Sequence, residues 1–318
     1  MAEIIRNRKQ NYANFFNEIK IKDYDDELIS KFTDEINTYG NAVIHDVLSE
    51  EEINKAKSIL LNLSKKSNTL RLQSPELEHK IFLELIVHPL CRKIWKICLG
   101  GDPICSHFDG NIISGYSEAD IWWHIDHPNM LSDIYPENLV GQTIIMLDDF
   151  TEENGATKII PGSHKKGVGP DNFIDSINKN EIPSKTICGK KGSFSFTMGG
   201  VWHTAGVNKT NKSRVALVIM YVAPHTVRNH DMTRAIIKYK NLPKFVEKTL
   251  GSAAWIPLPR QSVSDKKDII FKITNKIINL IPIKIIEYVY MMITKRLYDE
   301  RKKMWGFDGK ISSKEKNS

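Results

Sequence analysis

Hydrophobic and polar positions alternate in two different ways along this chain, and the change falls at residues 100–101, a Gly-Gly pair. Before the pair, apolar residues recur every three or four positions, which predicts helices within residues 24–66 and over 76–99. Residues 39–44 interrupt the first helical region and have the pattern of a turn followed by a short strand. The N-terminal third is therefore expected to be mainly helical.

One helix start in this region has a specific signature. Ser49 precedes Glu50 and Glu51, and Glu52 stands at the third position after it. A serine whose side chain caps the helix, with a glutamate three residues later, forms a capping box. We therefore expect a helix to begin immediately after Ser49.

After the glycine pair, short runs rich in β-branched and aromatic residues alternate with turn signals such as Asp109-Gly110. Several short strands with frequent turns are typical of a β-sandwich or barrel. The sequence thus predicts a mainly β core with flanking helices. The predicted strands are Ile104–Phe108, Asn111–Tyr116, Thr143–Leu147, Thr157–Ile160, Gly192–Thr197 and Arg214–Val222.

The pattern becomes helical again from about residue 231. Residues 269–296 are rich in isoleucine with scattered lysines, and Pro282 is expected to break or kink a helix there. This region either forms a helical pair packed on the core or lies on a membrane interface with an apolar and a basic face. We expect an N-terminal helical region over 1–100, a catalytic core over 101–230 and a C-terminal helical extension over 231–318.

Composition narrows the class of protein. With 41% hydrophobic and 26% charged residues, the chain is an ordinary globular protein and not a disordered one. It has no CxxC pair, no apolar signal region at its N-terminus and no uncharged apolar stretch of about 18 residues. We therefore expect buried free thiols, no transmembrane helix and a cytoplasmic protein. The net charge of +7 is spread along the chain and comes without a nucleic-acid motif, which indicates a solvated basic surface. It leans toward an acidic small-molecule substrate and gives no support to nucleic-acid binding.

The segment with the most chemical information contains His124, Ile125 and Asp126. Alternate residues of a strand point to the same side, so the imidazole and the carboxylate can face one point. Two histidines and one carboxylate on one face of an ion are typical of non-haem Fe(II) oxygenases. The third ligand must come from elsewhere, and our candidate is His203, which follows two glycines. His127 is an alternative ligand, although its side chain should face away.

Arg214 begins a long apolar run eleven residues after His203. A cation inside an apolar barrel is costly unless it has an anionic partner, and a guanidinium pairs well with a carboxylate. One interpretation is therefore that Arg214 binds a carboxylate inside the barrel. The other is that it lies at a strand start and is exposed to water.

Over residues 32–223 the sequence resembles the phytanoyl-CoA dioxygenase family of Fe(II)/2-oxoglutarate-dependent oxygenases. The resemblance is carried by four segments, which are YGNAVIHDVLSEEEI, WWHIDHP, LDDFTEENGATKIIPGSH and GSFSFTMGGVWHTAGVNKTNKSRVALVIMYV. It implies a double-stranded β-helix, a cupin-like jelly roll with the metal at its open end.

By position in these motifs, the resemblance implies that His124, Asp126 and His203 bind iron and that Arg214 binds the distal carboxylate of 2-oxoglutarate. It also suggests Asn111 and Thr143 as polar contacts of this co-substrate. The implied reaction consumes O₂ and releases succinate and CO₂. Relatives that halogenate have a small residue in place of the carboxylate ligand, so a chain that retains Asp126 is expected to hydroxylate.

Two other classes of function fit the same residues. A His₂-carboxylate set also binds zinc, which would suit a cupin-type hydrolase or isomerase. A non-catalytic relative that acts as a binding protein is the second. For the oxygenase, we expect a small-molecule substrate that is acidic or lipid-like. A peripheral membrane contact would involve the C-terminal region.

Overall fold

The computed structural model describes residues 15–117, 122–126, 138–226, 228–230, 232 and 234–252. The chain divides into two units, Met1–Ala254 and Trp255–Ser318, and every described residue belongs to the first. The isoleucine-rich segment over 269–296 therefore lies outside the described residues, as does His127. The domain boundaries expected from the sequence remain predictions.

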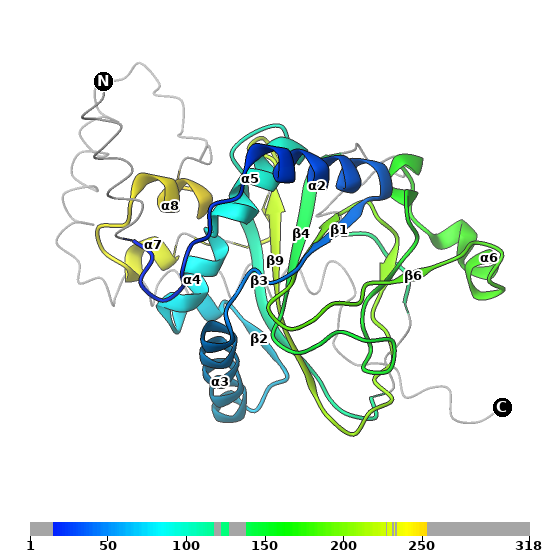
Figure 1. Cartoon of the computed structure of the whole chain (residues 1–318), viewed down its shortest axis with the longest axis horizontal. Coiled ribbons are helices and arrows are strands. Elements are labelled where there is room, and N and C mark those ends of the chain that lie inside the picture. Colours follow the sequence, from blue (N-terminus) through cyan, green and yellow to red (C-terminus); the bar gives the residue numbers. More distant parts are fainter. Residues whose placement is uncertain are drawn as a thin grey trace, which may run out of the picture. The chain divides into compact units, whose positions relative to one another are not determined.

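Two antiparallel sheets form the core (Figure 1). The larger sheet has the strand order β1-β7-β4-β9-β3-β2, and the smaller has the order β6-β5-β8. The strands of the large sheet are β1 (Asn41–Ile44), β7 (Phe194–Met198), β4 (Val140–Met146), β9 (Arg214–Val222), β3 (Ile104–Ile113) and β2 (Arg71–Gln73). Those of the small sheet are β6 (Lys185–Thr186), β5 (Lys158–Ile159) and β8 (His203–Thr204).

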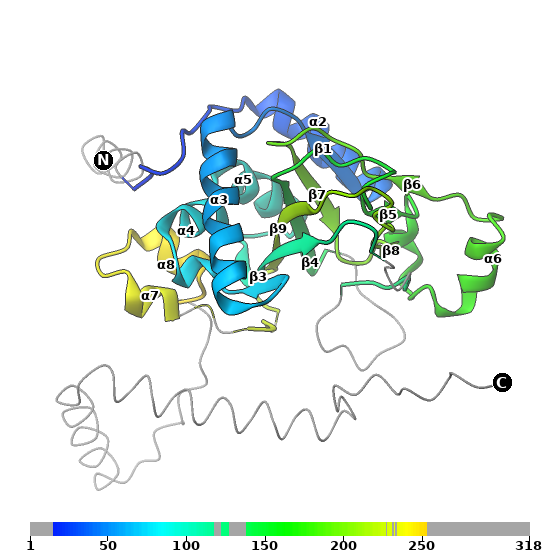
Figure 2. The same cartoon turned by 90° about the horizontal axis from the view of Figure 1, so that it is seen from below.

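Four helices gather on one face of the large sheet, and the small sheet lies toward the end of the molecule that carries α6 (Figure 2). The four are α2 (Asp26–Tyr39), α3 (Glu50–Ser67), α4 (Lys80–Ile86) and α5 (Pro89–Cys98). Shorter helices are η1 (Pro75–Leu77), η2 (Ser163–Lys166), η3 (Asp171–Phe173), α6 (Ile174–Asn178), α7 (Arg234–Lys238) and α8 (Lys244–Thr249).

The face of the large sheet that meets these helices is apolar and closely packed. Trp95 of α5 packs on Phe196 and Tyr221, with ring centroids 5.8 and 6.3 Å apart. Gly141 lies directly under the same indole, and a Cβ atom there would be 2.3 Å from it. We call this side of the sheet the helix-facing side and the opposite side the inner side.

The inner side is polar along much of its length. The strand register places Gln142 of β4 beside Thr197 of β7 and Met220 of β9. It also places Asp109 and Asn111 of β3 beside Val218 and Ala216. Because successive residues of a strand alternate between faces, these side chains share one side. Polar groups inside a barrel need a partner or a function.

Most elements agree with the sequence pattern, and one does not. The capping box at Ser49 and Glu52 is present, so the predicted start of α3 is confirmed. The predicted turn at Asp109-Gly110 is wrong, because β3 continues through it as one strand. A Cβ atom on Gly110 would be 2.2 Å from Leu60 of α3, so this glycine serves close packing rather than a turn.

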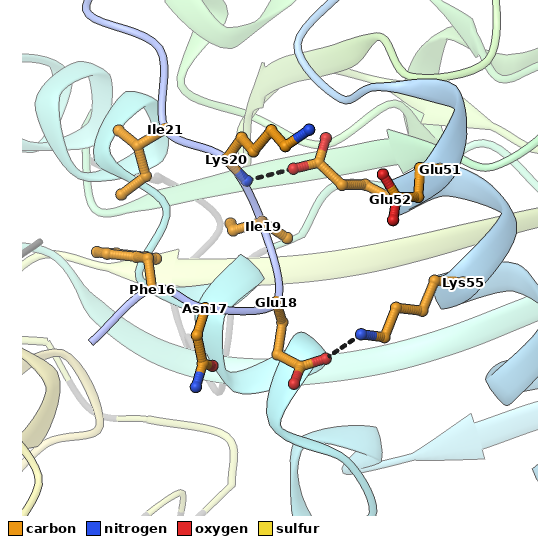
Figure 3. Close-up of a pocket in the computed structure, with 9 residues that line it drawn as sticks. All are labelled: Phe16, Asn17, Glu18, Ile19, Lys20, Ile21, Glu51, Glu52 and Lys55. Carbon is orange, nitrogen blue, oxygen red and sulfur yellow. Dashed lines mark hydrogen bonds and ion pairs between the residues drawn. The ribbon is translucent and has the colours of Figure 1, made fainter. Parts of the chain in front are cut away.

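Residues 15–21 form an irregular segment, bent at residues 17–19, that runs beside α3 and α4 along a groove of about 510 Å³ (Figure 3). The fully buried carboxylate of Glu84 accepts hydrogen bonds from the backbone N–H groups of three consecutive residues of the segment, at 3.1, 2.9 and 3.0 Å. Glu52 accepts from the N–H of Lys20, and Lys55 pairs with Glu18. These carboxylates fix the segment and are not part of the metal centre described below.

Within the described ranges, no helix combines the length and the hydropathy that a membrane span requires.

Candidate metal centre

A short antiparallel bridge brings the two predicted histidine ligands together. The backbone N–H of His124 donates to the carbonyl of His203 at 3.0 Å, and the reverse bond has the same length. The two imidazole rings lie 4.2 Å apart. One step further, the N–H of Asp126 donates to the carbonyl of Gly199 at 2.7 Å. Backbone pairing therefore sets the spacing of three side chains that are far apart in the sequence.

The ligand atoms converge on one point. The Nε2 atoms of His124 and His203 lie 3.9 and 3.5 Å from the carboxylate oxygens of Asp126. All three groups offer ligand atoms within 4.8 Å of one another, and no other such group occurs in the described part of the chain. Divalent metals bind these ligands at about 2.0–2.2 Å, so ligand atoms around one ion lie roughly 3 Å apart. The arrangement therefore fits a metal ion with little movement.

Both histidines direct an unprotonated Nε2 atom toward the candidate metal position. Nδ1 of His124 lies 2.9 Å from the carbonyl of Trp122, and Nδ1 of His203 lies 2.8 Å from the carbonyl of Val201. A carbonyl can only accept, so Nδ1 carries the proton and Nε2 is free to bind a metal. Burial, and then the neighbouring His203, lower the pKa of His124. The neutral form that a metal needs is thereby favoured.

Gln142 is a residue of this centre that the sequence interpretation missed. Its side-chain N–H group donates to the Oδ2 atom of Asp126, since a carboxylate can only accept. Gln142 lies on the inner side of β4 and is almost completely buried. The bond orients the carboxylate and leaves Oδ1 for a metal. The signal that could have revealed it is an amide in a mostly apolar strand, one position away from Thr143 and so on the opposite face.

Arg214 is buried on the inner side, with only 6% of its surface exposed. Its guanidinium lies over the ring of Phe150, at 4.0 Å from the centroid, and its Nε atom has no hydrogen-bond partner among the described residues. Burial lowers the pKa of Arg214 to about 10, although Asp148 opposes the shift. The interpretation of a strand-start arginine in water is therefore wrong, and the buried cation can accept an anionic ligand.

The two predicted polar contacts of the co-substrate lie on opposite sides of the sheet. Asn111 is on the inner side with Arg214, and its Oδ1 atom is buried without a partner among the described residues. Thr143 is on the helix-facing side, where its hydroxyl accepts a 2.8 Å hydrogen bond from the indole of Trp95. The structure brings Asn111 to the face of the site and does not bring Thr143 there.

Aromatic residues line the backbone around the ligands. Trp202 is fully buried and donates from its indole to the carbonyl of Val168 at 2.7 Å. Trp122 is 64% exposed, and its ring stacks on that of His124 with centroids 4.9 Å apart. Ser163 accepts from the backbone N–H of Trp202 at 2.8 Å, so the PGSH segment supports the strand that carries His203. Trp202 and Ser163 are thus structural, whereas Trp122 faces the open side.

Comparison with known families agrees with this geometry. The family model for phytanoyl-CoA dioxygenase (PhyH) matches residues 36–216, a range that includes the three candidate ligands and Arg214. Uncharacterized protein Rv1501 of Mycobacterium tuberculosis is 26% identical over 243 residues, which cover 69% of this chain and 81% of that protein. Dioxygenase af480 of Aspergillus fumigatus is 31% identical over 181 residues, which cover 56% of this chain and 54% of its own length.

Solved structures are similar in fold. The crystal structure of EctD from S. alaskensis with bound Fe has a TM-score of 0.56 at 16% identity and covers 66% of this chain and 82% of that one. The non-heme alpha ketoglutarate dependent carbocyclase SnoK from nogalamycin biosynthesis has a TM-score of 0.54 at 17% identity, with coverages of 66% and 90%. The predicted mainly β core with flanking helices, a double-stranded β-helix of the cupin-like type, is thereby confirmed.

Proposed function

Because the chain belongs to the phytanoyl-CoA dioxygenase family, we propose that it is an Fe(II)- and 2-oxoglutarate-dependent dioxygenase that hydroxylates a small organic substrate. The single observation that carries the proposal is the convergence of His124, Asp126 and His203 within 4.8 Å of one another. A His₂-carboxylate set leaves coordination positions open for a co-substrate and O₂.

The donor set supports iron as the resident metal. Two neutral imidazoles and one carboxylate suit Fe(II), and solved relatives of this fold were obtained with Fe and with 2-oxoglutarate. Zinc accepts the same ligands, so the donor atoms alone do not separate an oxygenase from a hydrolase. Arg214 favours the oxygenase, because a buried cation on the same side of the sheet suits a dicarboxylate co-substrate.

With iron, 2-oxoglutarate and O₂ bound, such a centre supplies the oxidative decarboxylation of 2-oxoglutarate to succinate and CO₂, with the second oxygen atom inserted into a C–H bond of the substrate. The residues of the chain bind and orient. Asp126 and the Nε2 atoms of the two histidines bind the metal, and Gln142 fixes the carboxylate through its N–H group. The carbonyls of Trp122 and Val201 hold the protons on Nδ1.

Arg214 binds the distal carboxylate of 2-oxoglutarate in this proposal, and Asn111 contributes a polar contact nearby. Both lie on the inner side of adjacent strands, where Asn111 pairs in register with Ala216, two residues from Arg214. The guanidinium is already positioned by Phe150, so little side-chain entropy is lost when the anion binds. The unpaired Oδ1 atom of Asn111 would then obtain a partner.

The test is succinate formation by the purified protein. The chain is loaded anaerobically with Fe(II), 2-oxoglutarate is added, and succinate is measured after exposure to O₂. We expect iron-dependent succinate without any added substrate, because this class often turns over 2-oxoglutarate in an uncoupled reaction. The matched control is Asp126→Ala, which should abolish the signal while the protein stays folded.

Absence of succinate from protein that has bound one equivalent of Fe(II) and 2-oxoglutarate would contradict the proposal. Tight zinc binding with hydrolysis of an ester or amide panel would instead support the cupin-type hydrolase.

A further inference from the structure

A second polar cluster lies on the inner side of the large sheet, apart from the metal ligands. It consists of His107 and Asp109 on β3, Arg71 on β2 and His230, which follows β9. Nε2 of His107 lies 2.7 Å from Oδ2 of Asp109, and Nε of Arg71 donates to the same oxygen. The rings of His107 and His230 lie 4.6 Å apart. The proposed roles of the metal centre use none of these residues.

The strand register sets the distance between this cluster and the metal centre, and a small substrate could span it. His107 lies opposite Met220 of β9, and Met220 lies opposite Gln142 of β4, whose amide contacts Asp126. Neighbouring strands are about 4.8 Å apart, so the backbones of His107 and Gln142 are separated by roughly 10 Å. Both side chains point to the inner side. A substrate anchored at the cluster could therefore extend a reacting carbon toward the metal centre.

Asp109 positions the other members of the cluster. It is 1% exposed, and burial opposes its charge, but the contacts with His107 and Arg71 outweigh burial and lower its pKa. The ionised carboxylate requires a proton on Nε2 of His107. Nδ1 of that ring is then directed elsewhere and has no hydrogen-bond partner in the described residues. The Oδ1 atom of Asp109 is buried and has no hydrogen-bond partner among the described residues.

The exposed charge of the cluster is positive, because Asp109 is buried and Arg71 is not. The terminal nitrogens of Arg71, whose side chain is 65% exposed, can only donate. With the proton on Nε2, Nδ1 of His107 accepts in the neutral ring and donates only in the imidazolium form. A further acid, Glu76, is 1% exposed, and burial raises its pKa to about 7, so its negative charge is reduced at neutral pH. His230 stays neutral, because burial and then His107 lower its pKa.

We propose that Arg71 and His107 bind an anionic group of the substrate, a carboxylate or a phosphate, while Asp109 positions both. This inference rests on the proposed dioxygenase function and names a substrate class for it. The exposed guanidinium of Arg71, which Asp109 holds in place, matches an anion better than a neutral group, because its parallel N–H donors pair with a carboxylate or a phosphate. The substrate is then an acid whose charged end lies on β2 and β3.

The experiment observes His107 directly. Protein labelled with ¹³C and ¹⁵N in its ten histidines is loaded with zinc in place of iron and saturated with 2-oxoglutarate, so that Arg214 is already occupied. The ring signals of His107 are assigned from their loss in His107→Gln. Acetate, inorganic phosphate and ethylene glycol are then titrated as probes of a carboxylate, a phosphate and a neutral ligand.

We expect acetate or phosphate to shift the His107 signals in a saturable way, and the preferred probe identifies the anion. Arg71→Gln should weaken this binding at least tenfold, whereas Lys65→Gln, which removes an exposed charge of the same sign on α3, should not change it. In Asp109→Asn, the ¹⁵N signals should show that the proton no longer stays on Nε2. An unchanged ¹⁵N signature, or unchanged anion binding in the same variant, would show that Asp109 does not position His107 for the ligand.

Three results would overturn the proposal. They are saturable binding of ethylene glycol alone, no response of His107 to either anion, and unchanged anion binding in Arg71→Gln. The readout does not require turnover, so it separates this proposal from the dioxygenase assignment. A protein that forms succinate but binds no anion at His107 refutes only the subsite.

Discussion

Asp126 is the residue on which the metal centre converges, since both histidines and Gln142 contact its carboxylate. The sequence predicts the His124/Asp126 pair because alternate residues of an extended segment face one side. His203 and Arg214 were candidates on local grounds, and the motif strengthened both, because spacing along the chain does not determine which strands become neighbours. Thr143 and Gln142 are neighbours in the sequence, but Thr143 lies on the helix-facing side and Gln142 at the site. An error of one residue in a predicted strand register therefore selects the wrong side chain.

Gln142 is expected to tune metal binding. In Gln142→Leu the carboxylate of Asp126 loses the N–H donor that orients it, and loss of such a supporting hydrogen bond typically weakens metal affinity by about 10- to 100-fold. Isothermal titration with Fe(II) under anaerobic conditions measures the change. Gln73→Leu, the same substitution at an exposed position of β2, is the control. Equal affinities in the two variants would show that the Gln142 contact does not support the metal.

Arg214 is expected to affect co-substrate binding and stability in opposite directions. Arg214→Met removes two charge-assisted hydrogen bonds to 2-oxoglutarate, worth about 1.5 kcal/mol each, so the KM for 2-oxoglutarate should rise about 100-fold. The free energy of unfolding without ligand should stay the same or increase, because a buried cation with no salt bridge among the described residues is replaced by an apolar side chain. Steady-state kinetics and urea denaturation measure the two effects. A large loss of stability would indicate a structural arginine instead.

At the level of elements, the hydrophobic pattern identified most helices and strands, but it divided β3 into two strands. β9 has the predicted bounds, Arg214–Val222, because a long apolar run between polar residues has only one reasonable interpretation. The Asp109-Gly110 pair has the composition of a turn, yet it lies inside β3, since the glycine makes room for Leu60. Amino-acid composition does not distinguish a glycine that forms a turn from one that allows a neighbouring side chain to pack closely against the strand.

Gly141 allows close packing of α5 on β4, as Gly110 does for α3 on β3. In Gly141→Ala the new Cβ atom would lie 2.3 Å from the indole of Trp95, so the helix or the strand must shift. Overpacking of this kind costs about 1–3 kcal/mol, and we expect a loss of that size in urea denaturation. Gly169→Ala is the control, because the nearest atom to its new Cβ is 3.5 Å away. If both variants are equally stable, the close contact between β4 and α5 is not maintained in solution.

At the scale of the whole molecule, the sheet order β1-β7-β4-β9-β3-β2 pairs strands that are far apart in the sequence. Local patterns contain no information on such pairings, so the sequence alone predicted only a sandwich or barrel. The resemblance to a family supplied the double-stranded β-helix. The helical coverage of one side was predictable from the N-terminal pattern, whereas the polar inner side became visible only with the strand register.

Global stability is expected to depend on Glu76. Burial raises its pKa from 4.5 to about 7, so between these values the folded chain binds more protons than the unfolded chain. The stability that this group contributes is therefore present below about pH 4.5 and lost as the pH rises through 7, on the order of 2–3 kcal/mol. Urea denaturation at pH 5 and pH 7.5 should show a smaller pH-dependent loss in Glu76→Gln. Glu78→Gln, at an exposed position, should behave as the wild type, and identical profiles for all three would refute the assignment.

The two sides of the large sheet also bear on how this protein can diversify. On β9, and on β3 beyond the register shift at Cys105/His107, alternate side chains belong to the apolar layer under the helices, and the intervening ones lie on the inner side with the candidate metal ligands. Changes at the intervening positions can alter which molecule is accepted while the helix-supported scaffold is preserved. A new specificity could thus arise from exchanges at alternate positions of existing strands, without a new loop.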